Sequence, residues 1–407
     1  MMSILAINGG EPVRTKPYPK WPVARANELE HLMKVLESSD WGVLNSEVDK
    51  LAEAFRDFTG AKYALPVSNG TISLEIILRA LNIGRGDEVI IPIYTFVASV
   101  SAIAMVGATP VFADVEYSSH LLDYKSVERS ITSKTKAIMV VHVGGRPCDM
   151  DSILQLANKY NIPVIEDAAQ AHGAQWKDKK AGTMGIAGSF SSQASKNIPA
   201  GEGGIITTDD EVLYRKMWSI RDYGRDHNSG IWYSHKELGT NAGIGAWQAA
   251  ILLEQLKDAE QLLEKRMDSC RYLTEQLCHL LFLEFLSEDE RVSKNACHLL
   301  MLKYKKEHLE NIPRKRFLDA LRAEGITIFG DGYSQPINTM GIMQSEAFFR
   351  ATGTERRYDE IDTPVAEKIA LEEGIWMLQP AMLEEKEDLD LIVQAMEKIM
   401  ANAKELK

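Results

Sequence analysis

The sequence of 407 residues is short of cysteine, since it has four and none pairs with another in a Cys-x-x-Cys motif. No histidines stand at the spacing that would complete a zinc site, so the sequence predicts neither a metal centre nor a disulfide framework. A long chain with so few cysteines is typical of a reducing compartment, and we expect a cytoplasmic protein. The first residues, MMSILAINGGEPVR, lack the basic stretch and the long apolar run of a signal peptide. The four cysteines are Cys148, Cys270, Cys278 and Cys297.

Positive charge is also scarce. Lys and Arg total 46 against 58 Asp and Glu, which gives a net charge of −12. This charge argues against nonspecific binding to nucleic acid or to an anionic membrane. Residues 89–113 carry no charge and approach the length of a membrane span. Pro92, Gly107 and Pro110 divide this stretch into strand, helix and strand, so a buried βαβ unit explains it better.

Several common signatures are missing. The glycine-rich segments GRGDEV and GTMGIAG do not fit G-x-G-x-x-G after a first strand, which disfavours a nicotinamide-dependent oxidoreductase. The sequence also has no G-x-x-x-x-G-K-[ST] phosphate loop and no H-E-x-x-H zinc motif. No helix-turn-helix stands out, and the charge is wrong for a DNA-binding regulator.

Short apolar runs alternate with amphipathic stretches over the first two thirds of the chain. Runs of Val and Ile that alternate with helices predict an α/β fold with a mostly parallel sheet covered on both faces. We expect strands at 87–92, 110–115, 136–143, 162–169, 188–192 and 203–208, and helices at 71–83, 95–106, 124–131, 149–160 and 210–220.

The pattern changes near residue 245. Helical spacing is sustained from 245 to 277 and predicts one long helix that leaves the first domain. A strand at 298–304 and helices at 314–325 and 388–406 then predict a smaller α+β unit. Because the chain is long for a single core, we expect a large domain of residues 1–250, including an N-terminal arm, and a small C-terminal domain of residues 251–407.

Three polar segments follow predicted strands or begin a predicted helix, where ligands of open α/β sheets collect. SNGT, residues 68–71, precedes a helix, whose free N–H groups and dipole favour an anion. The same residues would also serve as an ordinary N-cap. EDAAQAHG, residues 166–173, ends one strand, and GSFSSQASKNIPAGEGG, residues 188–204, contains another.

Asp167 and Lys196 are the notable charged side chains of these segments. Asp167 ends a buried strand, so its carboxylate needs a cationic or hydrogen-bonding partner, which either a structural Arg or Lys or a cofactor could supply. Lys196 stands among serines and glycines. Most lysines are solvated surface groups, and the alternative is that this one holds a ligand covalently.

Taken together, these groups fit pyridoxal phosphate (PLP) better than any other cofactor. Its phosphate needs a helix N-terminus and hydroxyls, which residues 68–71 and Ser191 offer. Its ring nitrogen needs a carboxylate such as Asp167, and its aldehyde needs a lysine such as Lys196. Phe96, which follows the strand at 87–92, is placed to stack on the ring.

The ordered series of these motifs resembles the DegT-type sugar and cyclitol aminotransferases, over essentially the whole chain. These are PLP-dependent enzymes of the aspartate-aminotransferase fold (fold type I). The resemblance therefore implies a mostly parallel seven-stranded sheet between helices in the large domain. The motifs that carry it are SNGTISLE, IPIYTFVAS, VIEDAAQAHGA, GSFSSQASKNIPAGEGGIITTDD and LGTNAGIGAWQAA.

The resemblance assigns roles around the cofactor ring. Lys196 would be the Schiff-base lysine and the proton shuttle of transamination. Asp167 would pair with the pyridinium nitrogen, and Gln170 would approach the phenolic oxygen. Phe96 would stack on the ring face.

The resemblance also assigns a phosphate site. Gly70, Thr71 and Ser191 would bind the phosphate from one chain. Asn241, in LGTNAG, is similar to the asparagine that the partner subunit contributes in this family. It therefore implies a homodimer with shared active sites.

Within the family, FSSQASKNIPAGEGG resembles the glutamine-dependent inosose and aminohydroxybenzoate branch. GGEPVRTKPYPKWP and TPVAEKIALEEGIWMLQPAML are similar to segments of L-glutamine:scyllo-inosose aminotransferases. The resemblance implies ping-pong transfer of an amino group from L-glutamine or L-glutamate to a cyclic ketone, either a ketocyclitol such as an inosose or a ketosugar, in aminocyclitol or amino sugar biosynthesis. Ser192 and the pair Ile198-Pro199 depart from the common family residues, which leaves the acceptor open.

Two alternatives remain within PLP chemistry. One is a ketosugar dehydrase, although relatives with that activity tend to lack the Schiff-base lysine. The other is a PLP-binding regulatory protein with little turnover. Arg221, Arg225 and Tyr333 are candidate substrate contacts, and a structural or surface role is the alternative for each.

Overall fold

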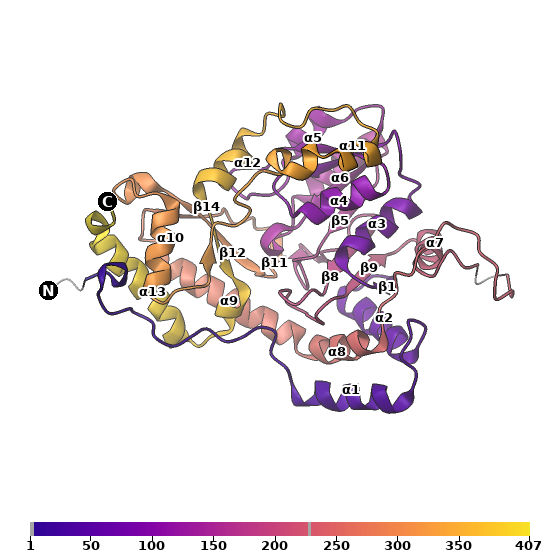
Figure 1. Ribbon diagram of the computed structural model, residues 1–407, viewed down its shortest axis with the longest axis horizontal. Helices are drawn as coiled ribbons and strands as arrows, with labels where there is room; N and C mark the ends of the chain where they lie inside the picture. Colours follow the sequence, from indigo (N-terminus) through magenta and orange to yellow (C-terminus); the bar gives the residue numbers. More distant parts are fainter. Residues whose placement is uncertain (1–3, 227–228) are drawn as a thin grey trace.

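Three sheets organise the computed structural model, which describes residues 4–226 and 229–407 (Figure 1). The largest has seven strands in the order β1-β9-β8-β5-β4-β2-β3. The strands from β8 to β3 pair in parallel, and β9 runs antiparallel to both β8 and β1. The prediction of a mostly parallel seven-stranded sheet is confirmed. Its strands are β1 (Tyr63–Val67), β2 (Glu88–Pro92), β3 (Thr109–Ala113), β4 (Thr135–Val141), β5 (Val164–Asp167), β8 (Ala187–Ser191) and β9 (Gly204–Thr208).

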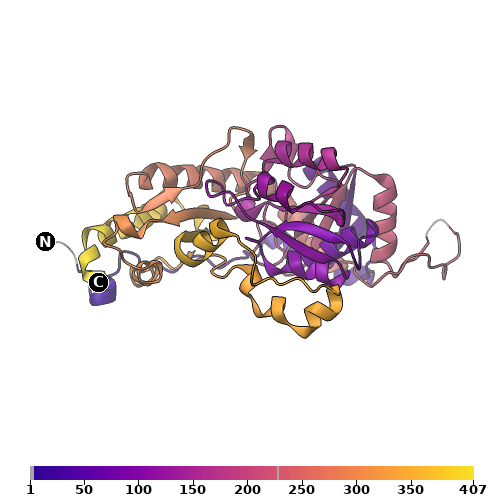
Figure 2. The ribbon, with the colours of Figure 1, turned by 90° about the horizontal axis from the view of Figure 1, so that it is seen from above.

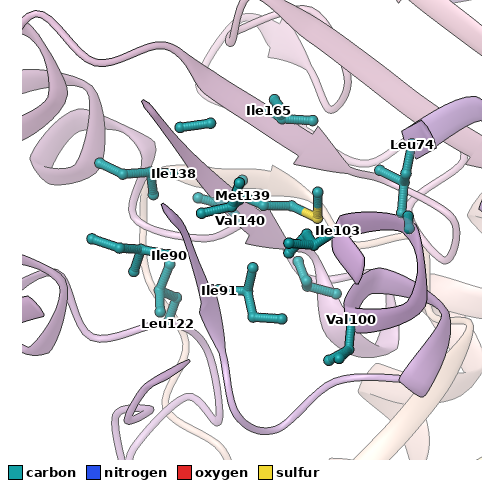
Figure 3. Packing of buried hydrophobic residues seen from close by; sticks show 14 of the residues in the cluster. Leu74, Ile90, Ile91, Val100, Ile103, Leu122, Ile138, Met139, Val140 and Ile165 are labelled. Atoms are coloured by element: carbon teal, nitrogen blue, oxygen red, sulfur yellow. The ribbon is translucent and has the colours of Figure 1, made fainter. Parts of the chain in front are cut away.

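The middle strands are buried on both faces because helices pack around the sheet. Ile90 and Ile91 of β2 lie beside Met139 of β4, and Leu74 and Ile103 cover them from neighbouring helices (Figure 3). Such continuous apolar runs are typical of parallel sheets in α/β folds. The helices of this part are α1 (Ala26–Ser38), α2 (Ser46–Thr59), α3 (Gly70–Ala80), α4 (Val97–Met105), α5 (Tyr124–Ser130), α6 (Met150–Tyr160), α7 (Glu211–Arg221) and α8 (Ala246–Lys257).

A second unit contains a four-stranded antiparallel sheet in the order β10-β12-β14-β13. It has its own hydrophobic core, and Figure 2 shows it at one end of an elongated molecule. A third, three-stranded sheet joins β6 and β7 of the first unit to β11 near the second. The remaining elements are β6 (Gln175–Trp176), β7 (Lys179–Lys180), α9 (Ala259–Leu277), β10 (Leu283–Phe285), β11 (Val292–Lys294), β12 (Leu299–Tyr304), α10 (Arg314–Ala323), β13 (Phe329–Gly330), α11 (Glu346–Thr352), α12 (Pro364–Lys368), β14 (Gly374–Leu378) and α13 (Lys386–Ala401).

The single long helix expected at 245–277 is instead two helices, α8 and α9. They meet at Asp258, whose φ of −106° and ψ of 4° leave the helical region. Apolar spacing continues through this residue, so the periodicity did not reveal the break. The domain boundary at residue 250 stays a prediction. Later residues, including Met343 and Phe348, pack against the first core.

The N-terminal arm, residues 4–25, runs along the second unit before it reaches α1 (Figure 1). Leu5 belongs to the core of that unit. The Arg14 guanidinium is buried and pairs with Asp388 at 2.6 Å and with Glu384 at 3.4 Å. The arm is therefore fixed to the C-terminal helix α13 by buried charges.

No helix within residues 4–226 and 229–407 is both long and apolar enough to cross a membrane.

Candidate functional site

The carboxyl ends of β5 and β8 and the first turn of α3 bring most of the predicted site residues together. Asp167 is the last residue of β5, and Lys196 lies five residues after β8. Because these strands are neighbours and run parallel, their ends meet at one edge of the sheet. The charge of Lys196 lowers the pKa of Asp167, and the charge of Asp167 raises the pKa of Lys196, so the two side chains are close enough to interact.

Asp167 is a buried carboxylate held by neutral donors. Ser99 Oγ donates to its Oδ2 at 2.9 Å, and the Ala169 N–H donates to its Oδ1 at 3.2 Å. Burial raises the pKa of the Asp167 carboxyl, while the Ser99 hydrogen bond opposes that rise. Among the described residues, no Lys or Arg forms an ion pair with it. Its charge is thus left for a cationic ligand.

The residue before it, Glu166, fixes the end of β5. Its carboxylate accepts hydrogen bonds from three main-chain N–H groups of residues 182–185, at 2.6 to 2.7 Å. His142 Nε2 lies 3.0 Å from the same carboxylate. Because the Cys148 N–H donates to His142 Nδ1, the ring nitrogen that donates to Glu166 is Nε2. Glu166 and His142 therefore have structural roles.

Lys196 is half-buried and its amine makes no hydrogen bond to any described residue. Burial lowers the pKa of this amine, and the negative charge of Asp167 opposes the effect. Its main-chain N–H donates to the Gln193 carbonyl at 2.9 Å, within a tight loop. His172 lies close enough for the Lys196 charge to act on it, and burial lowers the pKa of His172 to about 3.

The first turn of α3 forms a cradle with Ser191. Asn69 caps the helix by accepting from the Ile72 N–H at 2.9 Å. The N–H groups of Gly70 and Thr71 have no acceptor among the described residues. A Cβ at Gly70 would lie 2.8 Å from Ser191 Cβ, so glycine is required for this close approach. Two free N–H groups and one hydroxyl are suited to a phosphate.

An aromatic group lies beside this edge. Phe96 is the N-cap residue of α4 rather than a core residue, and its side chain is 59% exposed. The Tyr333 ring, from the second unit, lies 6.5 Å from it and within 28° of parallel. Gln170 contacts Tyr333, since its Nε2 donates to Tyr333 Oη at 3.3 Å, and its Oε1 accepts from the Gly144 N–H at 2.7 Å. Tyr333 is thus part of the site.

The other candidates have different contacts. Asn241 is exposed, forms a main-chain bridge with Asp222, and makes no hydrogen bond to Lys196 among the described residues. Arg221 is buried and donates to the Pro66 carbonyl at 3.2 Å. Arg225 lies 4.2 Å over the Trp232 ring. Arg221 therefore joins α7 to β1, and Arg225 is engaged within its own segment.

Sequence reasoning missed two contacts of the site. Ser99 lies one helical turn after Phe96, which was predicted from its position after the strand at 87–92. The same reasoning could have indicated Ser99 as a site residue. The Trp21 indole donates to the Lys196 carbonyl at 3.1 Å, and no local pattern indicated that contact.

The fold is similar to those of solved aminotransferases and is the α/β fold of PLP-dependent transferases. The sequence model of the DegT/DnrJ/EryC1/StrS aminotransferase family matches residues 22–397. The chain belongs to this family and is an aminotransferase.

Relatives and solved structures agree with this assignment. The chain is 35% identical to a putative L-glutamine:3-amino-2,3-dideoxy-scyllo-inosose aminotransferase of Micromonospora echinospora, over 100% of this chain and 99% of the relative. It is 32% identical to the L-glutamine:scyllo-inosose aminotransferase of Streptomyces griseus, over 100% of both. The structure of 3-amino-5-hydroxybenzoic acid synthase is similar, with a TM-score of 0.86, 26% identity, and coverage of 96% of this chain and 99% of that one. The structure of an aminotransferase from Psychrobacter cryohalolentis also gives a TM-score of 0.86. Its identity is 31%, and the match covers 95% of this chain and 100% of that one.

Proposed function

We propose that this enzyme uses PLP to move an amino group from L-glutamine or L-glutamate to a cyclic ketone, in two half-reactions. The observation that carries the proposal is the pair of ionisable groups of opposite sign at the sheet edge, the half-buried Lys196 and the buried Asp167. Neither has an ion-pair partner at salt-bridge distance among the described residues. Buried ionisable groups without such partners are expected where a charged ligand completes the site.

The residues fit the cofactor group by group. When bound, PLP supplies an electron sink for the carbon that loses a proton. Lys196 Nζ would hold the cofactor covalently and, once released, would accept and return that proton. Its lowered pKa supports this role, because a larger fraction of the amine is neutral near pH 7. Asp167 would keep the ring nitrogen protonated, and Gln170 would hold the phenolic oxygen.

The phosphate would bind at the cradle of Gly70, Thr71 and Ser191. The free N–H groups of α3 would donate to the phosphate oxygens, and the helix dipole would favour its charge. Phe96 would cover one face of the ring, and its exposed side chain supports this.

The names of the relatives support glutamine as donor and an inosose-type ring as acceptor. We infer that Tyr333 contacts such a substrate, and its hydrogen bond with Gln170 supports this. A ring whose hydroxyls are equatorial presents C–H groups on both faces, which suits packing against an aromatic side chain such as Tyr333.

We also infer a homodimer in the cytoplasm. The outer face of α1 exposes Leu29, Met33 and Leu36, which lie on one side of the helix. After α7 the chain extends away from the sheet (Figures 1 and 2), and Trp232 and Leu238 are exposed there. A second copy would bury these apolar surfaces. Asn241, which follows this segment, would then contribute to the site of the other subunit.

The first test is the visible absorbance of the purified protein with PLP, before and after L-glutamine. We expect a yellow lysine-bound form that L-glutamine converts to the colourless amine form, with no ketone present. Lys196→Ala should give no yellow form. A yellow form that ignores both L-glutamine and L-glutamate would overturn the donor assignment and favour the dehydrase or the regulatory protein.

A further inference from the structure

The main-chain carbonyl of Lys196 is held by a side chain from the N-terminal arm. Trp21 Nε1 donates to it at 3.1 Å, across 175 positions of sequence. Among the described residues, no main-chain N–H donates to this carbonyl. The indole is therefore the hydrogen-bond donor to this carbonyl. It holds the backbone of Lys196, whose amine must be oriented toward the cofactor.

The Trp21 ring is itself fixed by the second unit. The Arg266 guanidinium of α9 lies 5.4 Å from the ring centroid, within the range of a cation–π contact. Arg266 is 1% exposed, and its Nε donates to Gln379 Oε1 at 2.8 Å. A buried guanidinium held in this way restricts the plane of the indole and so the direction of its N–H.

The next residue, Asn197, is held from the same side. Its Nδ2 donates to the Ala296 carbonyl at 2.7 Å, so its Oδ1 accepts from His298 Nδ1 at 3.0 Å. Ala296 and His298 lie just before β12. Residues 196 and 197 are thus attached to the arm and the second unit, while the Lys196 amine stays without a described partner.

We propose that Trp21 is a positioning residue for Lys196, which orients its amine by holding its carbonyl. The inference rests on the proposed function, because Lys196 must be the residue that captures the cofactor. Loss of the indole N–H should leave Lys196 able to react but less well aimed. The rates of PLP capture and of donor turnover should fall, while binding of the donor should not change.

The experiment compares Trp21→Phe with the wild type. Phenylalanine keeps an aromatic ring under Arg266 and removes only the N–H and part of the ring. A net hydrogen bond corresponds to about a two- to ten-fold change in rate. We expect this fall both in the rate of PLP capture and in kcat with L-glutamine, with KM for L-glutamine and the Tm little changed.

Trp176→Phe is a matched control. Trp176 also carries a guanidinium over its ring, that of Arg291 at 4.5 Å, and its N–H donates to Asp151 at 3.2 Å. This contact does not involve residues 196 and 197, so both rates should stay near the wild-type values. Trp21→His is a second variant, because its smaller ring keeps an N–H donor. It should retain more activity than Trp21→Phe.

The outcomes separate the two proposals. If the wild type captures PLP but does not react with L-glutamine, the donor assignment fails and the Trp21 comparison rests on the capture rate alone. Unchanged capture in Trp21→Phe, an equal loss in Trp176→Phe, or a loss confined to KM would each overturn the positioning role. Equal losses in Trp21→Phe and Trp21→His would also do so.

Discussion

Burial shifts the pKa values of Asp167 and Lys196 in opposite directions. It raises the pKa of the carboxyl and lowers the pKa of the amine, and the charge of each residue partly restores the ordinary pKa of the other. Burial makes the charged form of each group costly, and neither has a partner at salt-bridge distance among the described residues. A cofactor that brings a ring cation to one and an aldehyde to the other would relieve both costs.

At this scale we predict the pH dependence of PLP capture by the apoenzyme. Capture needs the neutral amine, so its rate should rise with pH and level off below 10.5, the ordinary pKa of lysine. Asp167→Asn removes the negative charge that raises the pKa of Lys196, so the midpoint of the rise should move to lower pH. The measurement is the initial rate of appearance of the visible band between about pH 6 and about pH 10.

Asp210→Asn is the control, because it removes a carboxylate from the N-cap of α7 and not from the site. It should leave the midpoint unchanged. A wild-type midpoint at 10.5, or one that Asp167→Asn does not shift downward, would contradict the electrostatic account of this pair.

Single residues differ in how far the sequence predicts them. The positions of Gly70, Asp167 and Ser191 follow from local signals, because each lies at the end of a strand or the start of a helix. Phe96 was expected near the ring, but its exposure depends on the capping geometry of α4. Trp21 could not be predicted, since its contact depends on the path of the whole arm.

Among the elements, the strands of the large sheet were predictable because their apolar runs are short and bounded by turns. Residues 87–92 became β2 (Glu88–Pro92) and 203–208 became β9 (Gly204–Thr208). The first strand, β1, was not expected from the pattern, because YALPV is short and contains a proline. The break at Asp258 was missed because apolar periodicity does not respond to one residue that leaves the helix.

The arm is the element whose attachment is easiest to test. Arg14 is fully buried between Asp388 and Glu384, and replacing it by Met should leave these carboxylates without their buried cation. We expect a loss of about 3 kcal/mol in the free energy of unfolding, measured by urea denaturation.

Lys16 provides the comparison, since it contacts the same Asp388 at 3.4 Å with a side chain that is 67% exposed. Lys16→Met should cost less than about 1 kcal/mol. If the two variants lost similar amounts, burial would not be what makes the Arg14 contact strong.

For the whole molecule, the question is whether one chain completes its own site. Among the described residues Asn241 makes no hydrogen bond to Lys196, and the family resemblance places it in the partner's site. This placement can be tested by pairing two defective chains, Lys196→Ala and Asn241→Ala, each inactive or impaired alone.

We predict that co-expression of the two variants restores activity. In random pairing, half of the dimers are mixed, and each mixed dimer has one site with both native residues, so about a quarter of wild-type activity is expected. Differently tagged chains allow the mixed dimer to be isolated and assayed. If Asn241 serves its own chain, both sites of the mixed dimer are defective and activity stays at the level of the impaired parent.

The Arg14 pair with Asp388 has a consequence for how the molecule is made, because its partners are 374 positions apart. At a synthesis rate of about 5–20 residues per second, the arm leaves the ribosome about 20 to 75 seconds before Asp388 does. During that interval the sheet can form, but Trp21 has no anchored arm to hold it against Lys196. The earliest part of the chain to emerge is thus among the last to be anchored, because its partner Asp388 is made late.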